Sequence, residues 1–176
     1  MSSLSATLEN SFVRLEPLAE RHRAPLRAAG EDPDLWRFAT VNQHGTDFDA
    51  WIDARLAAMK DQGEVTFAVF DKARADYVGS SSFLSVEPAH KRVEIGWTWY
   101  AKSAWGGAVN PACKIAMMSH AFGAAGYHRV EFKLDATNKR SWAAAPNAWD
   151  IIAILQAGLT APPHADFAYQ VHPIST

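Results

Sequence analysis

The chain has 176 residues, of which 48% are hydrophobic, and its 17 basic and 19 acidic side chains give a formal net charge of −2. This length suits one hydrophobic core and is short for two, so we expect a single domain over residues 1–176 and, without a basic cluster, no nucleic-acid partner. No apolar run approaches the roughly 20 residues of a membrane span and no signal-peptide pattern opens the sequence, so we expect a cytoplasmic protein without a membrane partner.

The first half of the chain predicts a strand followed by two helices. Residues 12–16 alternate apolar and polar side chains, as in a short strand. From Leu18 to Ala29 the apolar spacing is helical, with His22 on the same face. A second helix is predicted after Thr46, which can cap it, and ends at Gly63. Its apolar face consists of Phe48, Trp51, Ile52, Leu56 and Met59.

The second half predicts four strands and one helix. Residues 65–70, 77–86 and 92–100 are rich in β-forming residues and are separated by short connections, which favours an antiparallel meander. A helix over residues 111–125 and a strand over residues 128–134 follow. A helix between two strands implies a crossover connection. The sequence therefore predicts a mixed α/β (α+β) fold.

The strongest local signal is the turn between residue 100 and the helix that follows. Its two glycines can adopt positive φ and leave space for a ligand, while Asn110 suits an N-cap and Pro111 the first helical position. Free N–H groups and the helix dipole would attract a pyrophosphate, and Lys114 would add charge. An ordinary strand-turn-helix junction is the alternative. The turn consists of Trp105, Gly106, Gly107, Ala108, Val109 and Asn110.

The turn and its neighbours together resemble one protein family. Neither a P-loop motif nor a dinucleotide-binding G-x-G-x-x-G is present. Instead the chain resembles the GNAT acetyltransferases, specifically the RimJ/RimL-like ribosomal-protein N-terminal acetyltransferases. The resemblance covers residues 12–141 and rests on a Glu-Ile-Gly-aromatic strand from Glu94, the Trp-Gly-Gly-Ala turn, and an Asn-x-x-Ser step that ends at Ser141.

This resemblance implies a GNAT-like, mostly antiparallel central sheet flanked by helices, in the order β-α-α-β-β-β-α-β-α-β-β. It implies acetyl-CoA as a co-substrate, with pantetheine along a splayed strand that ends near Tyr100 and pyrophosphate at the turn. The implied CoA-binding residues are Trp97, Thr98, Trp99, Trp105, Gly106, Gly107, Ala108, Val109, Asn110, Lys114 and Asn138. Ser103 departs from the family, which often has Gln or Arg there.

Acetyl transfer to an amine requires a base, a site for the oxyanion and a proton for the departing thiol. By resemblance Glu94 is the candidate base; a carboxylate paired with Lys91 or Arg92 at the rim is the alternative. A backbone N–H near Gly96 could hold the oxyanion if the strand splays from its neighbour.

The candidate proton donor is Ser141, because the tyrosine that many family members carry after the asparagine is missing. Asn138 and Ser141 would equally suit the cap of a following helix.

Other reactive side chains have weaker patterns. The single cysteine, Cys113, excludes an internal disulfide and has no adjacent histidine, so a packed side chain competes with an acetyl-carrying nucleophile. The seven histidines lack metal-ligand spacing, and we expect no metal. Four aromatic residues could line an acceptor pocket or belong to the core. They are Trp36, Phe38, Trp97 and Trp99.

Residues 142–176 depart from the family, because Pro146 would end the expected helix early. Two closing strands could still lie over residues 150–155 and 166–171. We therefore expect an N-acetyltransferase that moves acetyl from acetyl-CoA to a primary amine, of a protein N-terminus or a small molecule, by direct attack. A catalytically impaired CoA-binding relative and an interaction domain are the alternatives. The final strands could pair to form a homodimer.

Overall fold

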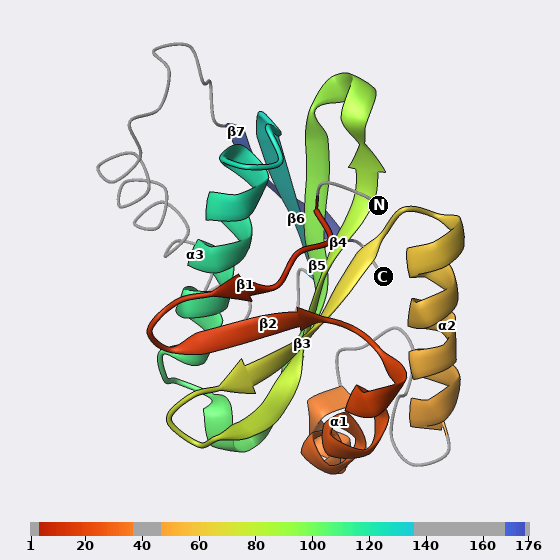
Figure 1. Ribbon diagram of the computed structural model, residues 1–176, viewed down its shortest axis with the longest axis vertical. Helices are drawn as coiled ribbons and strands as arrows, with labels where there is room; N and C mark the ends of the chain where they lie inside the picture. Colours follow the sequence, from red (N-terminus) through yellow and green to blue (C-terminus); the bar gives the residue numbers. More distant parts are fainter. Residues whose placement is uncertain (1–3, 37–46, 136–167, 175–176) are drawn as a thin grey trace.

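The computed structural model describes residues 4–36, 47–135 and 168–174. In these residues seven strands form one sheet, in the spatial order β1-β2-β3-β4-β5-β6-β7 (Figure 1). The strands are β1 (Leu8–Glu9), β2 (Val13–Pro17), β3 (Val65–Asp71), β4 (Asp76–Glu87), β5 (Arg92–Tyr100), β6 (Arg129–Asp135) and β7 (Ala168–Ile174). The helices are α1 (Arg23–Ala29), α2 (Asp47–Asp61) and α3 (Val109–Phe122).

The sheet changes character after β5. The strands from β1 to β5 pair antiparallel, each with its neighbour. In contrast, β5 pairs parallel with β6, and β6 pairs parallel with β7. The parallel β5–β6 pair is connected through α3, which confirms the predicted crossover. The mixed, mostly antiparallel sheet flanked by helices agrees with the predicted fold class.

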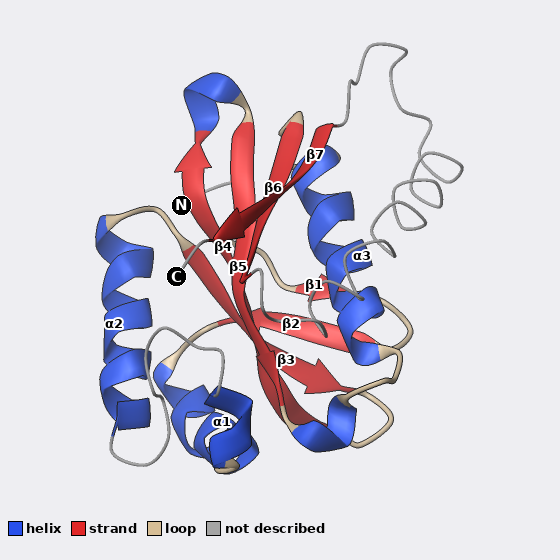
Figure 2. Cartoon of the chain, turned by 180° about the vertical axis from the view of Figure 1, so that it is seen from behind, coloured by secondary structure: helices blue, strands red, loops and turns tan. Residues whose placement is uncertain are grey.

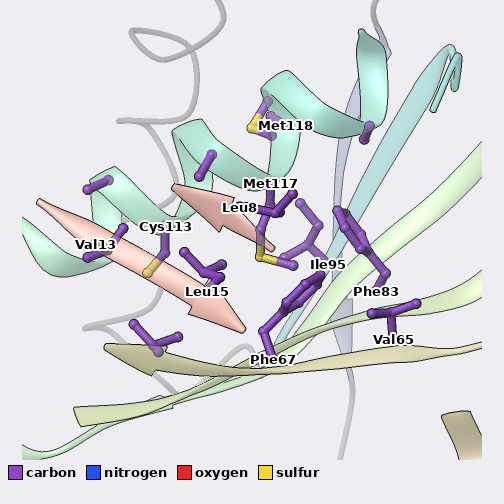
Figure 3. Packing of buried hydrophobic residues seen from close by; sticks show 14 of the residues in the cluster. Leu8, Val13, Leu15, Val65, Phe67, Phe83, Ile95, Cys113, Met117 and Met118 are labelled. Atoms are coloured by element: carbon purple, nitrogen blue, oxygen red, sulfur yellow. The ribbon is translucent and has the colours of Figure 1, made fainter. Parts of the chain in front are cut away.

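The helices cover the two faces of the sheet. Helix α3 lies on one face, and α1 and α2 lie on the other (Figures 1 and 2). On the α3 face, Met117 and Cys113 pack against Leu15, Phe67 and Ile95 from the strands, all of them buried (Figure 3). On the other face a second core, which contains four aromatic residues, joins α2 to the sheet. It consists of Leu18, Leu26, Leu35, Trp36, Phe48, Trp51, Ile52, Ala68 and Trp99.

Two expected helices begin differently in the structure. The segment from Leu18 to Ala29 is divided into a 3-10 turn over Glu20–His22 and α1, with Pro25 in the first turn of α1, where a missing N–H is harmless. His22 lies in the turn and is buried; its Nδ1 accepts a hydrogen bond from the Ala19 N–H at 3.0 Å, and its Nε2 lies 3.2 Å from Glu16 Oε2.

Helix α3 begins at Val109, and Ala108 is its N-cap, so the prediction that Asn110 caps this helix is wrong. Pro111 instead lies in the first turn, where its missing N–H has no intrahelical partner to lose. Strand β1 was not predicted, because two residues carry no periodic pattern. Thr46, the predicted strand over residues 150–155 and the helix after residue 138 lie outside the described residues. No helix among the described residues is long and apolar enough to cross a membrane.

Candidate active site

Strand β5 has a bulge at its centre. Gly96 pairs with Ser82 of β4, but Trp99 pairs with Ser80, so β5 carries one residue more than β4 between these pairs. Trp97 lies in this bulge with φ of +48°, a left-handed conformation that is uncommon for a residue with a side chain. The bulge therefore resets the direction of the side chains that follow it on β5, Thr98 included.

Strands β5 and β6 separate after a short contact. They pair only over three positions, which match Arg92 to Glu94 with Arg129 to Glu131. Among the described residues, β5 from Ile95 onward pairs with β4 alone, while β6 continues its pairing with β7. The sheet thus has an opening between the second halves of β5 and β6, and the splayed strand implied by the family resemblance is confirmed. We refer to this space as the β5–β6 opening.

Glu94 is the last residue of β5 before the opening. Its side chain faces away from α3, because the flanking Val93 and Ile95 belong to the core on the α3 face. Glu94 is 7% exposed, and its Oε2 lies 2.6 Å from Lys133 Nζ and accepts a hydrogen bond from Ser85 Oγ at 3.1 Å. Two groups therefore fix the orientation of this buried carboxylate at the edge of the opening.

The alternative interpretation of Glu94, an ion pair with Lys91 or Arg92, is wrong. Arg92 instead pairs with Glu87 and with Glu131, at 3.3 Å from Glu131 Oε2. The partner of Glu94 is Lys133, which is 39 residues away in the sequence.

Gly96 allows the carboxylate of Glu94 to lie close to the bulge. A Cβ atom at this position would lie 2.8 Å from Leu84 Cδ1 and 3.3 Å from Glu94 Oε1. A side chain on residue 96 would therefore collide with the neighbouring leucine and crowd the carboxylate.

The predicted phosphate-binding turn leads from β5 into α3. Gly106 has φ of +69°, and a Cβ there would meet no atom within 4 Å, while a Cβ on Gly107 would meet only the Ala104 carbonyl oxygen at 3.9 Å. The indole Nε1 of Trp105 donates to the Tyr100 carbonyl at 2.7 Å and fixes the start of the turn. Ala108 offers no side-chain cap to α3. The turn thus exposes backbone, and its N–H groups at the helix N-terminus suit an anion.

Lys114 extends from α3 toward the opening. Its Nζ donates to Thr98 Oγ1 at 3.0 Å and lies 5.1 Å above the ring centre of Phe132 on β6. Thr98 Oγ1 in turn lies 2.8 Å from Ser81 Oγ. Desolvation lowers the pKa of Lys114 to about 8. The sequence suggested only that Lys114 adds charge near the turn, and gave no sign of these contacts.

The described aromatic candidates for an acceptor pocket differ in how deeply they are buried. Trp36 and Trp99 are buried with ring centres 5.0 Å apart, so the core interpretation is confirmed for both. Trp97 is half-buried, and the Arg55 guanidinium lies 4.8 Å from its ring centre. The side chain of Trp99 is therefore part of the core and is not available to contact a ligand. Phe38, like Asn138 and Ser141, lies outside the described residues.

Cys113 is a core residue, as the second interpretation of its position predicted. It is fully buried, and desolvation raises the pKa of its thiol to about 12. A thiolate nucleophile is therefore not available at neutral pH. Within the described part of the chain, no group of three or more His, Cys, Asp or Glu residues could hold a metal ion.

A separate open groove of about 410 Å³ lies at the other end of α3. It shares no residue with the glycine turn or the opening, and nothing in its lining suggests acyl transfer. The groove is lined by Gln62, Gly63, Val86, Pro88, Lys91, Ala125 and Tyr127.

Comparison with known proteins agrees with this geometry. The chain matches the model of a family described as acetyltransferase (GNAT) domain over residues 13–148. It is similar to a GCN5-related N-acetyltransferase from Brucella melitensis, with a TM-score of 0.74 and 26% identity over 81% of this chain and 66% of that chain. A structure from T. thermophilus, described as that of an acetyltransferase, has a TM-score of 0.69 and 30% identity over 80% of this chain and 72% of that chain.

The fold is also shared with Mycobacterium smegmatis RimJ, solved in complex with CoA-disulfide. The TM-score is 0.66 and the identity 20%, over 84% of this chain and 77% of that chain. No curated protein sequence matches the chain.

Proposed function

This chain belongs to the GNAT acetyltransferase family, and from this premise we propose that it transfers the acetyl group of acetyl-CoA to a primary amine by direct attack. Glu94 acts as the base in this proposal. The acceptor class is a protein N-terminus or a small amine, and the likeness to the RimJ fold supports testing N-terminal peptides first.

The observation that carries this proposal is that the β5–β6 opening begins at a buried, oriented carboxylate. Beyond the β5–β6 ladder, β5 has no strand partner on the β6 side in the described part of the chain, which suits an amide-containing chain such as pantetheine. The open space above Gly106 and Gly107 suits a pyrophosphate. Acetyl-CoA would supply an activated thioester, held by the backbone of residues 97–99 and by the N–H groups of the glycine turn.

The chemistry assigned to this chain starts with the acceptor amine, which must lose a proton before it can attack a thioester. Glu94 takes that proton, directly or through a water molecule, while Lys133 and Ser85 hold its carboxylate in one orientation. Free backbone N–H groups of β5 near the bulge stabilise the negative charge that develops on the carbonyl oxygen.

Two measurements test the proposal. Saturating acetyl-CoA is expected to stabilise the protein against thermal unfolding, by about 2.7 kcal/mol at 100 times the dissociation constant. A thiol-release assay with N-terminal peptides, polyamines and amino sugars is then expected to find an acceptor that accelerates the release of CoA above hydrolysis. Absence of stabilisation would refute CoA binding, and stabilisation without accelerated release by any amine would favour the impaired CoA-binding relative.

A further inference from the structure

Lys114 reaches the point where the two strands part. Phe132 is the first residue of β6 beyond the last pair with β5, and Thr98 belongs to the part of β5 that has no strand partner on this side within residues 4–36, 47–135 and 168–174. The ammonium group contacts both, as a donor to the Thr98 hydroxyl and as a cation above the Phe132 ring. It therefore lies at the β5–β6 opening and spans its two sides.

Glu94 and Lys114 approach this opening from opposite faces of the sheet. Lys114 comes from α3, and Phe132 belongs to the core on the α3 face, whereas Glu94 points to the other face with Lys133. A thioester placed between the strands would thus have a carboxylate on one side and an ammonium on the other. This arrangement suits a reaction in which one proton is removed and another is supplied.

The ammonium of Lys114 has no carboxylate partner among the described residues; the ion pairs there all involve other groups. From β4 and β5 it is faced by the hydroxyls of Ser81 and Thr98, and from β6 by the Phe132 ring. On its own helix, Cys113 is the titratable group that acts on its pKa. Glu131 and Lys133 flank Phe132 and point to the opposite face.

The geometry points to Lys114 as the proton donor to the departing thiol of CoA, an inference that rests on the function proposed above. The C–N bond to the acceptor forms, the C–S bond breaks, and its electron pair goes to sulfur. Lys114 Nζ gives one proton to that sulfur and becomes a neutral amine, which regains a proton from solvent. The acceptor ammonium loses one proton to Glu94 before the attack, and Glu94 passes it to solvent. Glu94 then takes the second proton, which the nitrogen loses after the C–N bond has formed, and releases it in the same way, so charge and atoms balance.

The acidity of the two groups supports this step. Desolvation lowers the pKa of Lys114 to about 8, so about nine-tenths of the side chain is protonated at pH 7. A free thiol has a pKa of about 8.5, so the proton passes between groups of nearly equal acidity. Neighbouring donors are poorly suited, because Tyr100 and Cys113 are buried with pKa values raised by desolvation.

The first test locates the ammonium without turnover. In the binary complex with CoA, a positive charge within about 4–6 Å of sulfur lowers the thiol pKa by a unit or more. The thiolate is followed by its ultraviolet absorbance, with the desulfo-CoA complex subtracted. Lys114→Met is expected to reduce the acidity of the bound thiol at least tenfold, and Lys114→Arg is expected to preserve it. Lys72→Met, which removes a lysine paired with Glu9 outside the site, is the control.

The second test uses the pH profile of acetyl transfer. In the wild type, kcat is expected to fall as the pH rises through about 8, because the ammonium is lost. Lys114→Met should lower kcat at pH 7 by about 10²-fold or more and lack this alkaline limb. Lys114→Arg keeps the charge but holds its proton too tightly, so it should bind acetyl-CoA normally and remain slow.

The outcomes separate this inference from the proposed function. An unchanged thiol pKa in Lys114→Met with CoA bound overturns the inference and leaves the acetyltransferase intact. So does a higher KM for acetyl-CoA with unchanged kcat, which would make Lys114 a phosphate-binding charge. Failure of the wild type to bind acetyl-CoA removes the proposed function, and the inference with it.

Discussion

Glu94→Gln is the sharpest test of the candidate base, because the fold offers a matched control in the adjacent strand. Glu131 pairs in register with Glu94 in the β5–β6 ladder, and both side chains are buried, at 4% and 7% exposure. Both form ion pairs, Glu94 with Lys133 and Glu131 with Arg92 and Arg129. The two substitutions therefore remove the same charge from almost the same place.

The expected effect on stability is small and similar in both variants. Glutamine keeps the volume of glutamate, and its carbonyl oxygen can still accept the hydrogen bond from Ser85 or from Lys133. The side chain of Lys133 is 44% exposed and can be rehydrated, so the loss of its ion pair costs about 1 kcal/mol or less. A difference in turnover between the two variants would thus not arise from unfolding.

The expected effect on turnover differs. Loss of a general base slows the reaction by about 10²- to 10⁴-fold, so Glu94→Gln should lower kcat in that range. Affinity for acetyl-CoA should change less than threefold. Glu131→Gln should retain most of the activity, because two arginines, Arg92 and Arg129, hold the Glu131 carboxylate, whereas Glu94 has one lysine and a hydroxyl as partners.

The assay is release of CoA thiol at saturating acetyl-CoA and acceptor, with affinity measured by the ligand-induced shift in unfolding temperature. Equal rates for Glu94→Gln and the wild type would refute the assignment. If Glu131→Gln is as slow as Glu94→Gln, turnover depends on the charges of both carboxylates and their cationic partners, and not on Glu94 as a base.

Three further predictions follow from single residues. Gly106→Ala should cost about 1–2 kcal/mol of unfolding free energy in denaturant titrations, because its φ of +69° is unfavourable for a residue with a Cβ atom, whereas Gly107→Ala should not. Equal losses would contradict the backbone argument. Burial acts to raise the pKa of Glu16, but hydrogen bonds from two arginines and a histidine hold it at about 2. The free energy of unfolding should therefore decrease as the pH falls from about 4.5 toward 2, and Glu16→Gln should flatten that part of the pH–stability curve. Because Cys113 is buried and its thiol pKa is raised, it should react with thiol reagents only when the protein unfolds, and Cys113→Ala should retain acetyl transfer. An inactive Cys113→Ala variant that still folds would instead support the acetyl-cysteine scheme.

Most of the sheet could be predicted from the sequence, because its strands carry local patterns. The β-rich stretch over residues 92–100 coincides with β5, and the predicted strands on either side differ from β4 and β6 by one residue at each end. The start of α3 was two residues off, because Asn110 and Pro111 are favourable at more than one position of a first turn. Local preference identifies such elements but leaves their first residue open.

The geometry of the site depends on long-range contacts that no local pattern encodes. The family resemblance implied that β5 would splay, but where it parts from β6 is set by register. The alternative interpretation of Glu94 paired it with its nearest basic neighbours in the sequence, yet its ion pair is with Lys133 on another strand. The direction of Lys114 likewise depends on how α3 crosses the sheet. Spacing in the sequence determines which residues share a face, and packing determines which of them meet.

The short ladder between β5 and β6 also has a mechanical consequence. Among the described residues the sheet has two parts, β1 to β5 and β6 to β7, which are joined by a ladder of three paired positions and by α3. A narrow ligand that carries amide groups, bound beyond the end of this ladder, would add hydrogen bonds between β5 and β6 where the described residues supply none. We therefore expect the two parts of the sheet to become more firmly joined when, and only when, a ligand binds at the opening.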